Sequence, residues 1–174
     1  MKAIVTGSSG FIGSALMGSL QRGGHQVVRL VRFDETIGAD TVYWHPLKGI
    51  SNTSALEGAE AVFHLAGENI ADGRWNVEKK RRIRDSRIIG TRTLSTTLSR
   101  LISPPKVMVM ASAVGIYGVN PDSVVTEDSS LGYDWLAQMC IEWESATAPA
   151  KNAGIRIVFM RMGIVLHPSG GMLK

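Results

Sequence analysis

Short apolar runs alternate with longer amphipathic segments along the chain. The apolar runs are rich in Val, Ile and Leu, which is typical of strands buried on both faces. Most segments between them carry apolar residues at helical spacing and end at glycine or proline. The pattern predicts strands at Lys2–Thr6, Gln26–Val31, Thr41–Trp44, Ala61–Leu65, Lys106–Ala111 and Ile155–Met160, and helices at Phe11–Gln21, 76–101 and 131–151.

This alternation of strands and helices predicts an α/β fold. Strands that are apolar on both faces form a parallel sheet covered by helices on each side, so we expect a Rossmann-type doubly wound parallel sheet. No internal repeat, low-complexity tract or linker interrupts the pattern. Residues 1–174 are therefore predicted to be one domain.

Composition narrows the class of protein further. The chain has 174 residues, of which 44% are hydrophobic and 20% charged, and no apolar run approaches the ~18 residues of a membrane span. Its single cysteine, Cys140, excludes an internal disulfide framework and a cysteine-rich zinc site. No two histidines share a metal-like spacing. We expect a cytoplasmic protein with no metal and no membrane contact.

Much of the net charge of +4 lies in one basic run, Lys79–Arg87. A solvated helix face is the favoured interpretation. One or two of these arginines contacting a phosphate is a second interpretation. Nucleic-acid binding is the least favoured, because the run has no interleaved aromatic residues, and we expect no nucleic-acid partner.

The strongest local motif is a glycine loop directly after the first strand and directly before the first helix. Its spacing is G-x-x-G-x-x-G, at Gly7, Gly10 and Gly13. The first glycine allows a tight turn, the second lets the backbone approach a pyrophosphate, and the third allows close helix packing. The helix N-terminus then faces the phosphates. The predicted cofactor contacts from this loop are Gly7, Ser9, Gly10, Phe11, Ile12 and Gly13.

The end of the second strand favours NADP over NAD. NAD sites carry Asp or Glu there, which binds the ribose hydroxyls. Here no carboxylate occurs before Asp34, and Arg32 lies where a 2′-phosphate would be met. A guanidinium suits a phosphate through its charge and its forked donors. We therefore predict NADP as the cofactor.

Further motifs follow the glycine loop in order along the chain. They are LAGENI at 65–70 followed by Arg74-Trp75, Ser86-Arg87 before Gly90-Thr91, SAVGIYG at 112–118, Trp143-Glu144, and RMGIVL at 161–166. Together with the glycine loop, they resemble the extended, epimerase-like form of the short-chain dehydrogenase/reductase superfamily. Within it, the chain resembles the NAD(P)-dependent epimerase/dehydratase family and its branch of epimerase family proteins, some known as cell-division inhibitors.

The resemblance implies where the cofactor lies and how much of the protein is present. It implies a Rossmann fold with NADP across the carboxyl ends of the strands, contacted also by Leu65, Ala66, Gly67 and Arg87. Extended members run well beyond residue 174. We therefore expect the chain to be the N-terminal portion of a longer protein, without its C-terminal substrate lobe.

The catalytic pattern of the superfamily is not present. That chemistry uses a Ser or Thr with a Tyr and a Lys one helical turn apart. Anchoring on Glu144 puts Leu136 and Cys140 at the Tyr and Lys positions, and the Ser/Thr position holds Ala113. The candidate substitutes are Ser112, as a hydrogen-bond donor, and Tyr117, as an acid. Cys140 is expected to be buried and inert.

The loop after the fourth strand is the candidate substrate contact. Glu68, Asn69, Arg74 and Trp75 are expected to overhang the nicotinamide end, although loop anchoring explains them equally well. Two functions therefore remain open. One is an NADP-dependent oxidoreductase or epimerase acting on a small carbonyl or sugar-like substrate. The other is a non-catalytic NADP-binding protein with a regulatory or structural role.

Overall fold

The computed structural model contains a seven-stranded sheet in the order β4-β3-β2-β1-β5-β6-β7. It describes residues 1–32, 38, 40–119, 124–168 and 170–171. The strands are β1 (Lys2–Thr6), β2 (Gln26–Val31), β3 (Thr41–His45), β4 (Gly49–Ile50), β5 (Ala61–His64), β6 (Val107–Ala113) and β7 (Arg156–Met162).

The sheet is parallel apart from β4, which pairs antiparallel with β3. The chain builds outward from β1 to β3 and then crosses back to lay β5 on the other side of β1. This reversal makes the carboxyl ends of β1 and β5 a topological switch point, where doubly wound sheets bind ligands. The structure confirms the predicted Rossmann-type fold.

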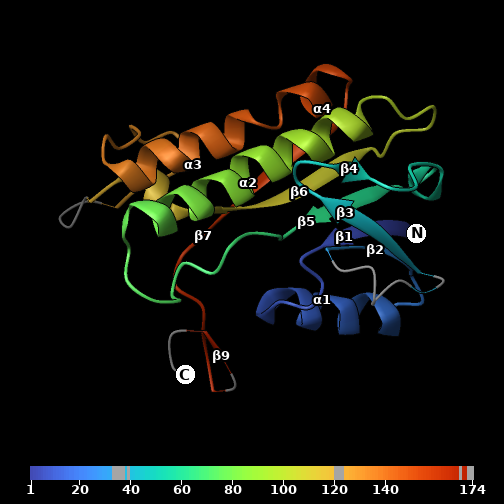
Figure 1. Cartoon of the computed structure of the whole chain (residues 1–174), viewed down its shortest axis with the longest axis horizontal. Helices are drawn as coiled ribbons and strands as arrows, with labels where there is room; N and C mark the ends of the chain where they lie inside the picture. Colours follow the sequence, from blue (N-terminus) through green and yellow to red (C-terminus); the bar gives the residue numbers. More distant parts are fainter. Residues whose placement is uncertain (33–37, 39, 120–123, 169, 172–174) are drawn as a thin grey trace.

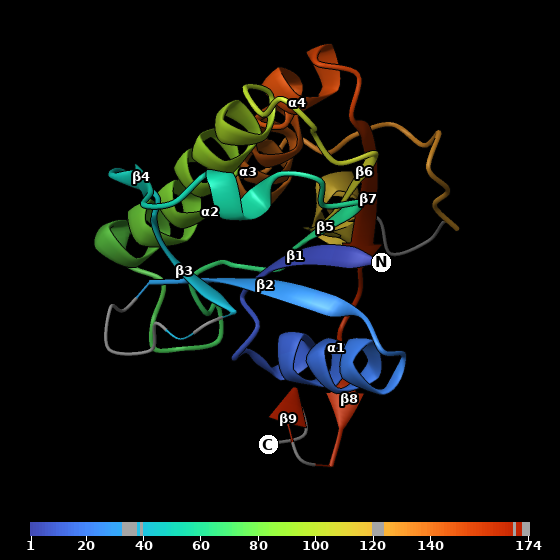
Figure 2. The same ribbon diagram turned by 90° about the vertical axis from the view of Figure 1, so that its right-hand side faces the viewer.

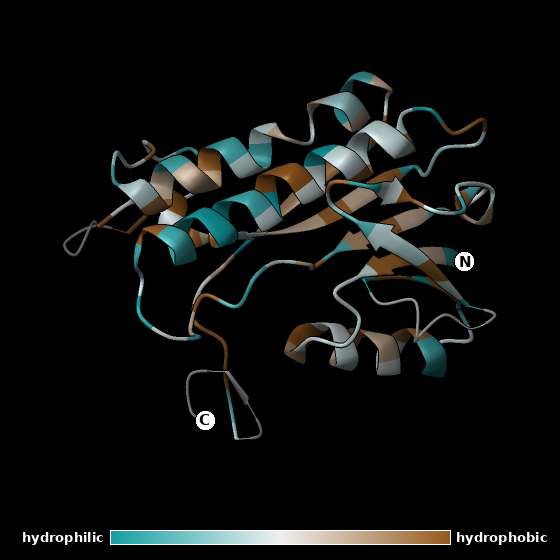
Figure 3. Cartoon of the chain, in the orientation of Figure 1, coloured by the Kyte–Doolittle hydropathy of each residue, from teal (hydrophilic) through white to brown (hydrophobic). Residues whose placement is uncertain are grey.

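Helices cover both faces of the sheet (Figures 1 and 2). On one face α1 (Phe11–Arg22) packs through Leu20 against Val5 and Val27. On the other lie α2 (Val77–Leu98), α3 (Trp135–Ser145) and the short α4 (Ala148–Asn152). The larger core lies under these helices, and hydrophobic residues are frequent along the central strands in Figure 3.

The predicted helix at 131–151 is wrong, because it divides into α3 and α4. The Asp134 carboxylate accepts hydrogen bonds from the backbone N–H groups of Leu136 and Ala137, so the helix begins only at Trp135. Pro149 has no N–H and lies in the first turn of α4, a position that proline tolerates. The chain therefore starts a second helix instead of continuing the first.

Other differences are small and local. Helix α2 ends at Leu98, three residues before the predicted end, and β6 continues two residues further, to Ala113. Short elements carried no periodic pattern and were missed. These are β4, the 3-10 turns η2 (Ser54–Leu56) and η3 (Val114–Tyr117), and the hairpin of β8 (Leu166–His167) and β9 (Gly170–Gly171).

A buried histidine connects the two sides of the switch point. The Thr6 hydroxyl accepts the N–H groups of Leu65 and Ala66, at 3.1 and 3.2 Å, so its own proton points to His64 Nδ1 at 2.7 Å. The proton of His64 is then on Nε2, which donates to Thr91 Oγ1 at 2.9 Å. Burial lowers the pKa of His64 from 6.5 to about 4.

The lowered pKa of His64 predicts a pH-dependent stability. In the unfolded chain His64 takes up a proton near pH 6.5, and in the folded chain only near pH 4. The contribution of neutral His64 to stability is therefore complete above pH 6.5 and decreases as the pH falls from 6.5 to 4. We expect a loss of about 1.4 kcal/mol per pH unit within the window. Urea unfolding at pH 5, 6 and 7 measures this slope.

His64→Gln is the control, because glutamine does not titrate. The slope between pH 5 and 7 should flatten in this variant even if its overall stability is lower. An unchanged slope would show that other groups carry the pH dependence.

Candidate functional site

A cavity of about 250 Å³ opens at the carboxyl ends of β1, β2 and β5. Its floor is the glycine loop, from Gly7 to Gly10, and one wall is the end of β2 with Arg32. The opposite wall is the segment after β5, which is Leu65, Ala66 and Gly67. Sequence motifs separated by about sixty residues therefore meet at one site.

The glycine loop is packed too tightly for side chains at two of its three glycines. Gly7 has φ +69°, and a Cβ there would lie 2.7 Å from the Leu65 carbonyl carbon and 2.8 Å from the Ala66 nitrogen. A Cβ on Gly13 would lie 2.0 Å from the Gly7 carbonyl oxygen, so the helix packs against the turn itself. A Cβ on Gly10 would approach only the Gly7 oxygen, at 3.2 Å, which leaves Gly10 open to the cavity.

Helix α1 begins at Gly10 without a side-chain cap. The other two long helices are capped, α2 by Asn76 and α3 by Asp134. Among the described residues, no side chain accepts the first N–H groups of α1, and the positive end of the helix dipole lies beside the cavity. This donor set fits the pyrophosphate of a dinucleotide. Phe11 and Ile12 form this first turn, whereas Gly7, Ser9 and Gly10 line the cavity.

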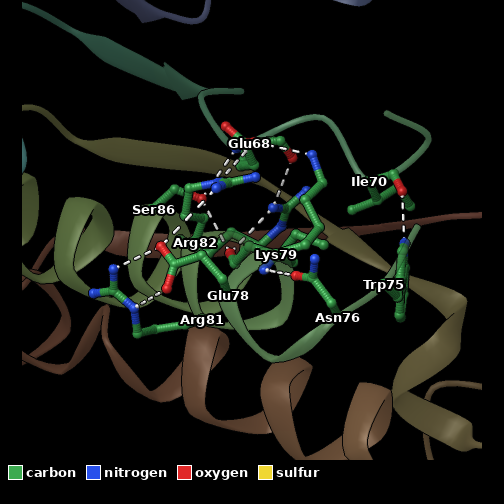
Figure 4. A network of polar contacts seen from close by, with 11 residues as sticks. Glu68, Ile70, Trp75, Asn76, Glu78, Lys79, Arg81, Arg82 and Ser86 are labelled. Carbon is green, nitrogen blue, oxygen red and sulfur yellow. Dashed lines mark hydrogen bonds and ion pairs between the residues drawn. The ribbon is translucent and has the colours of Figure 1, made fainter. Parts of the chain in front are cut away.

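Arg32 lies on the cavity wall and acts electrostatically on the opposite side. The hydrogen bond from Lys79 Nζ to the Glu68 carboxylate, at 2.9 Å, lowers the pKa of Glu68, and the charge of Arg32 has a smaller effect in the same direction. The guanidinium of Arg82 lies 3.6 Å from the same carboxylate (Figure 4). Asp34, the next carboxylate in the sequence, lies outside the described residues.

Arg87 supports the cavity wall from behind. Its Nη1 donates to the carbonyl oxygens of Glu68 and Ile83, and its guanidinium lies 5.0 Å from the centre of the Trp143 ring. A Cβ on Gly67 would lie 3.1 Å from the Arg87 Cζ. The guanidinium is thus stacked between Gly67 and Trp143, and Gly67 separates it from the cavity.

The basic run is a helix face whose charges are mostly compensated. Arg81 and Arg82 bind Glu78, and Arg84 binds Glu142. Lys79 is turned inward, with its side chain 6% exposed, and it anchors the loop after β5 through Glu68. The run therefore fixes that loop to α2.

Contacts between its own side chains and backbone groups also hold the predicted substrate loop. Asn69 Oδ1 accepts the N–H of Ala71, and the Trp75 indole donates to the Ile70 carbonyl at 2.8 Å (Figure 4). The Trp75 ring also packs edge-on against Trp135 of α3. Arg74 is exposed. The alternative of loop anchoring thus accounts for Asn69 and Trp75.

One polar cluster joins the two catalytic candidates. Ser112 Oγ donates to Glu144 Oε1 at 2.6 Å, and Arg161 binds both oxygens of the same carboxylate, at 3.0 and 2.9 Å. Arg161 Nη1 also donates to the Tyr117 hydroxyl at 2.7 Å. The hydrogen bond to Glu144 raises the pKa of Arg161, so the guanidinium stays charged beside Tyr117. Tyr117 and Arg161 line a second cavity, of about 410 Å³.

Helix α3 offers no tyrosine–lysine pair to this cluster. Leu136 packs against Gly115, where an added Cβ would lie 2.7 Å from Leu136 Cδ2. Cys140 is fully buried, and burial raises the pKa of its thiol to about 11. A thiol of this kind is protonated at neutral pH.

The comparisons with known proteins agree with this geometry. A family model, the NAD dependent epimerase/dehydratase family, matches residues 3–170. The chain belongs to this family. It is 43% identical over 170 residues to the epimerase family protein Mb2239 of Mycobacterium bovis, covering 98% of this chain and 56% of that protein. The chain thus spans little more than half the length of this relative.

Two solved structures of this family share the fold over 99% of the chain, each with a TM-score of 0.85. One is a nucleoside-diphosphate sugar epimerase from Corynebacterium glutamicum, 40% identical, of which 36% is covered. The other is human epimerase family protein SDR39U1, isoform 2, with NADPH, 29% identical, of which 57% is covered.

Within the described residues, no helix is long and apolar enough to cross a membrane.

Sequence reasoning missed the residues that hold the candidates in place. Glu144 and Arg161 each stood in a family motif, but neither was singled out as a site residue. Arg161 lies within β7, one residue beyond the predicted strand, and Glu144 is buried on α3. Arg29, inside a strand, also lines the first cavity. A charged residue within an apolar strand was the available signal.

The close packing at Gly13 gives a test of the loop. Gly13→Ala should lower the free energy of unfolding by at least about 2 kcal/mol, because its Cβ meets the backbone oxygen of Gly7. Gly18→Ala in the same helix is the matched control, since its Cβ meets only the flexible end of Arg22 at 3.3 Å. The control should be neutral or up to about 1 kcal/mol more stable. Equal stability of the two variants in urea unfolding would contradict this packing.

Proposed function

We propose that this chain binds NADP(H) and supplies the cofactor-binding part of an epimerase or oxidoreductase that acts on a small carbonyl or sugar-like substrate. The observation that carries the proposal is the uncapped, glycine-opened N-terminus of α1 beside a cavity walled by Arg32. Backbone donors there match a pyrophosphate, and a guanidinium matches a 2′-phosphate.

The choice of NADP over NAD rests on charge. The described wall at the end of β2 presents Arg32, and not the carboxylate that binds a free ribose hydroxyl in NAD sites. The NADPH in the human relative supports the same choice. The remaining contacts assigned to the cofactor are the glycine loop, Leu65, Ala66 and Gly67, with Arg87 holding Gly67 in place.

The bound nicotinamide would supply hydride transfer, and the chain would handle the proton. Tyr117 is the candidate acid, because its hydroxyl accepts from Arg161 and keeps its own proton to give. The hydrogen bond from Arg161 Nη1 fixes the position of this hydroxyl, which is a task of the lysine in the usual pattern. Ser112 donates to Glu144 and is assigned to holding this cluster in place.

The absence of a tyrosine–lysine pair on α3 favours the second candidate function, which is NADP binding in a regulatory or structural role without catalysis. With Leu136 and a protonated Cys140 at those positions, NADP binding without catalysis is consistent with the same structure. Substrate turnover distinguishes the two functions, because both require the cofactor.

Arg32→Ala tests the cofactor assignment. The wild-type chain should bind NADPH more tightly than NADH in isothermal titration calorimetry, and the substitution should weaken NADPH at least about tenfold with little effect on NADH. Equal losses for both nucleotides would remove the 2′-phosphate role of Arg32. Binding of neither nucleotide to the wild type would overturn the proposed function.

Tyr117→Phe tests the proton-transfer role. Oxidation of NADPH in the presence of a panel of small carbonyl compounds should fall by at least about a hundredfold, while NADPH affinity stays unchanged. Full activity in the variant would exclude Tyr117 as the acid. A wild-type chain that binds NADPH but reduces no carbonyl would favour the non-catalytic function.

A further inference from the structure

A second arginine, Arg29, lines the same cavity as Arg32. It lies in the middle of β2, where its Cα pairs with Val5 of β1, two residues before the glycine loop. Its side chain extends to that loop, and Nε donates to Ser8 Oγ at 3.0 Å. The hydrogen bond uses one edge of the guanidinium and directs the group to the floor of the cavity.

The charge of Arg29 is not balanced within the described part of the chain. No carboxylate oxygen there lies within ion-pair distance of it, whereas Arg81, Arg82, Arg84 and Arg161 each have one. Arg29 is partly buried and lies close to the positive end of α1, where a cation is unfavourable. An anion in the cavity would compensate both the guanidinium and the helix end.

We infer that Arg29 is a second cation of the 2′-phosphate site and a determinant of NADP specificity. The inference rests on the proposed function. Arg32 approaches the phosphate from the end of β2, and Arg29 approaches it from beneath the glycine loop. Two guanidinium groups of different origin enclose the phosphate, and Ser8 keeps the second one in position.

A merely structural role for Arg29 predicts a different result. If Arg29 only holds Ser8, its loss disturbs the loop that receives the pyrophosphate, and NADPH and NADH weaken equally. If its charge meets the 2′-phosphate, only NADPH weakens. The ratio of the two dissociation constants therefore separates a specificity role from a positioning role.

The test compares Arg29→Gln with two other variants by isothermal titration calorimetry. Arg156→Gln removes an exposed arginine at the start of β7 and controls for net charge. Ser8→Ala removes the hydrogen bond and keeps both arginines. Arg29→Gln should weaken NADPH at least about tenfold and NADH less than about twofold. Arg156→Gln should change neither, and Ser8→Ala should weaken NADPH more than NADH, though less than Arg29→Gln does, because it releases the Arg29 guanidinium but leaves its charge in the cavity.

Equal weakening of NADPH and NADH in Arg29→Gln, or no weakening of either, would overturn the inference. Far-UV circular dichroism and thermal melting check that each variant is folded. If Arg29→Gln does not fold, Arg29→Lys gives the same comparison. Lysine keeps the charge but not the forked donors, so this variant should retain the preference for NADPH only in part. Complete retention of the preference, or equal loss of affinity for both nucleotides, would again count against the inference. Failure of the proposed function would look different, since the wild type itself would then bind neither nucleotide.

Discussion

The contact between the end of β1 and the segment after β5 organises the rest of the structure. At Gly7 the backbone lies so close to Leu65 and Ala66 that no side chain fits. The Thr6 hydroxyl accepts the N–H groups of the same two residues, and neutral His64 fixes that hydroxyl from below. Because β1 and β5 run in parallel, this contact holds the glycine loop and the opposite cavity wall at a set distance. The cavity exists because these two strand ends are joined.

Electrostatics at this site is arranged in two layers. Around the cavity lie the open end of α1, Arg29 of β2 and Arg32 directly after β2, which together favour a polyanionic ligand. Behind it, Lys79 and Arg87 hold the loop after β5 through Glu68 and its carbonyl group. The family's usual catalytic helix instead presents Leu136 and a buried thiol, and the polar groups near the second cavity belong to Glu144, Arg161 and Tyr117. The part of the site suited to a dinucleotide is therefore better defined than the part suited to a substrate.

Local pattern was sufficient for the six parallel strands of the sheet and for the glycine loop. The strands from β1 to β3 are apolar runs with clear ends, and the spacing of the loop fixes where α1 begins. The break between α3 and α4 was missed because the apolar spacing continues across Thr147, while a cap at Asp134 and a proline at 149 decide the boundaries. Arg29, Glu144 and Arg161 escaped notice because their roles depend on partners from distant strands and helices. Pairings of that kind arise from the topology of the sheet, so a short window of sequence shows at most that a charged residue lies in an apolar strand, and not what it binds.

On the structure described above, we expect this cavity to recognise the phosphorylated adenosine half of the cofactor. Titration of the chain with adenosine 2′,5′-bisphosphate and with adenosine 5′-monophosphate tests it without the nicotinamide half and without any substrate. We expect the 2′-phosphorylated fragment to bind at least about tenfold more tightly, and added salt to reduce this preference. Equal affinity for the two fragments, or a preference for the one without the 2′-phosphate, would show that the cavity does not recognise the 2′-phosphate.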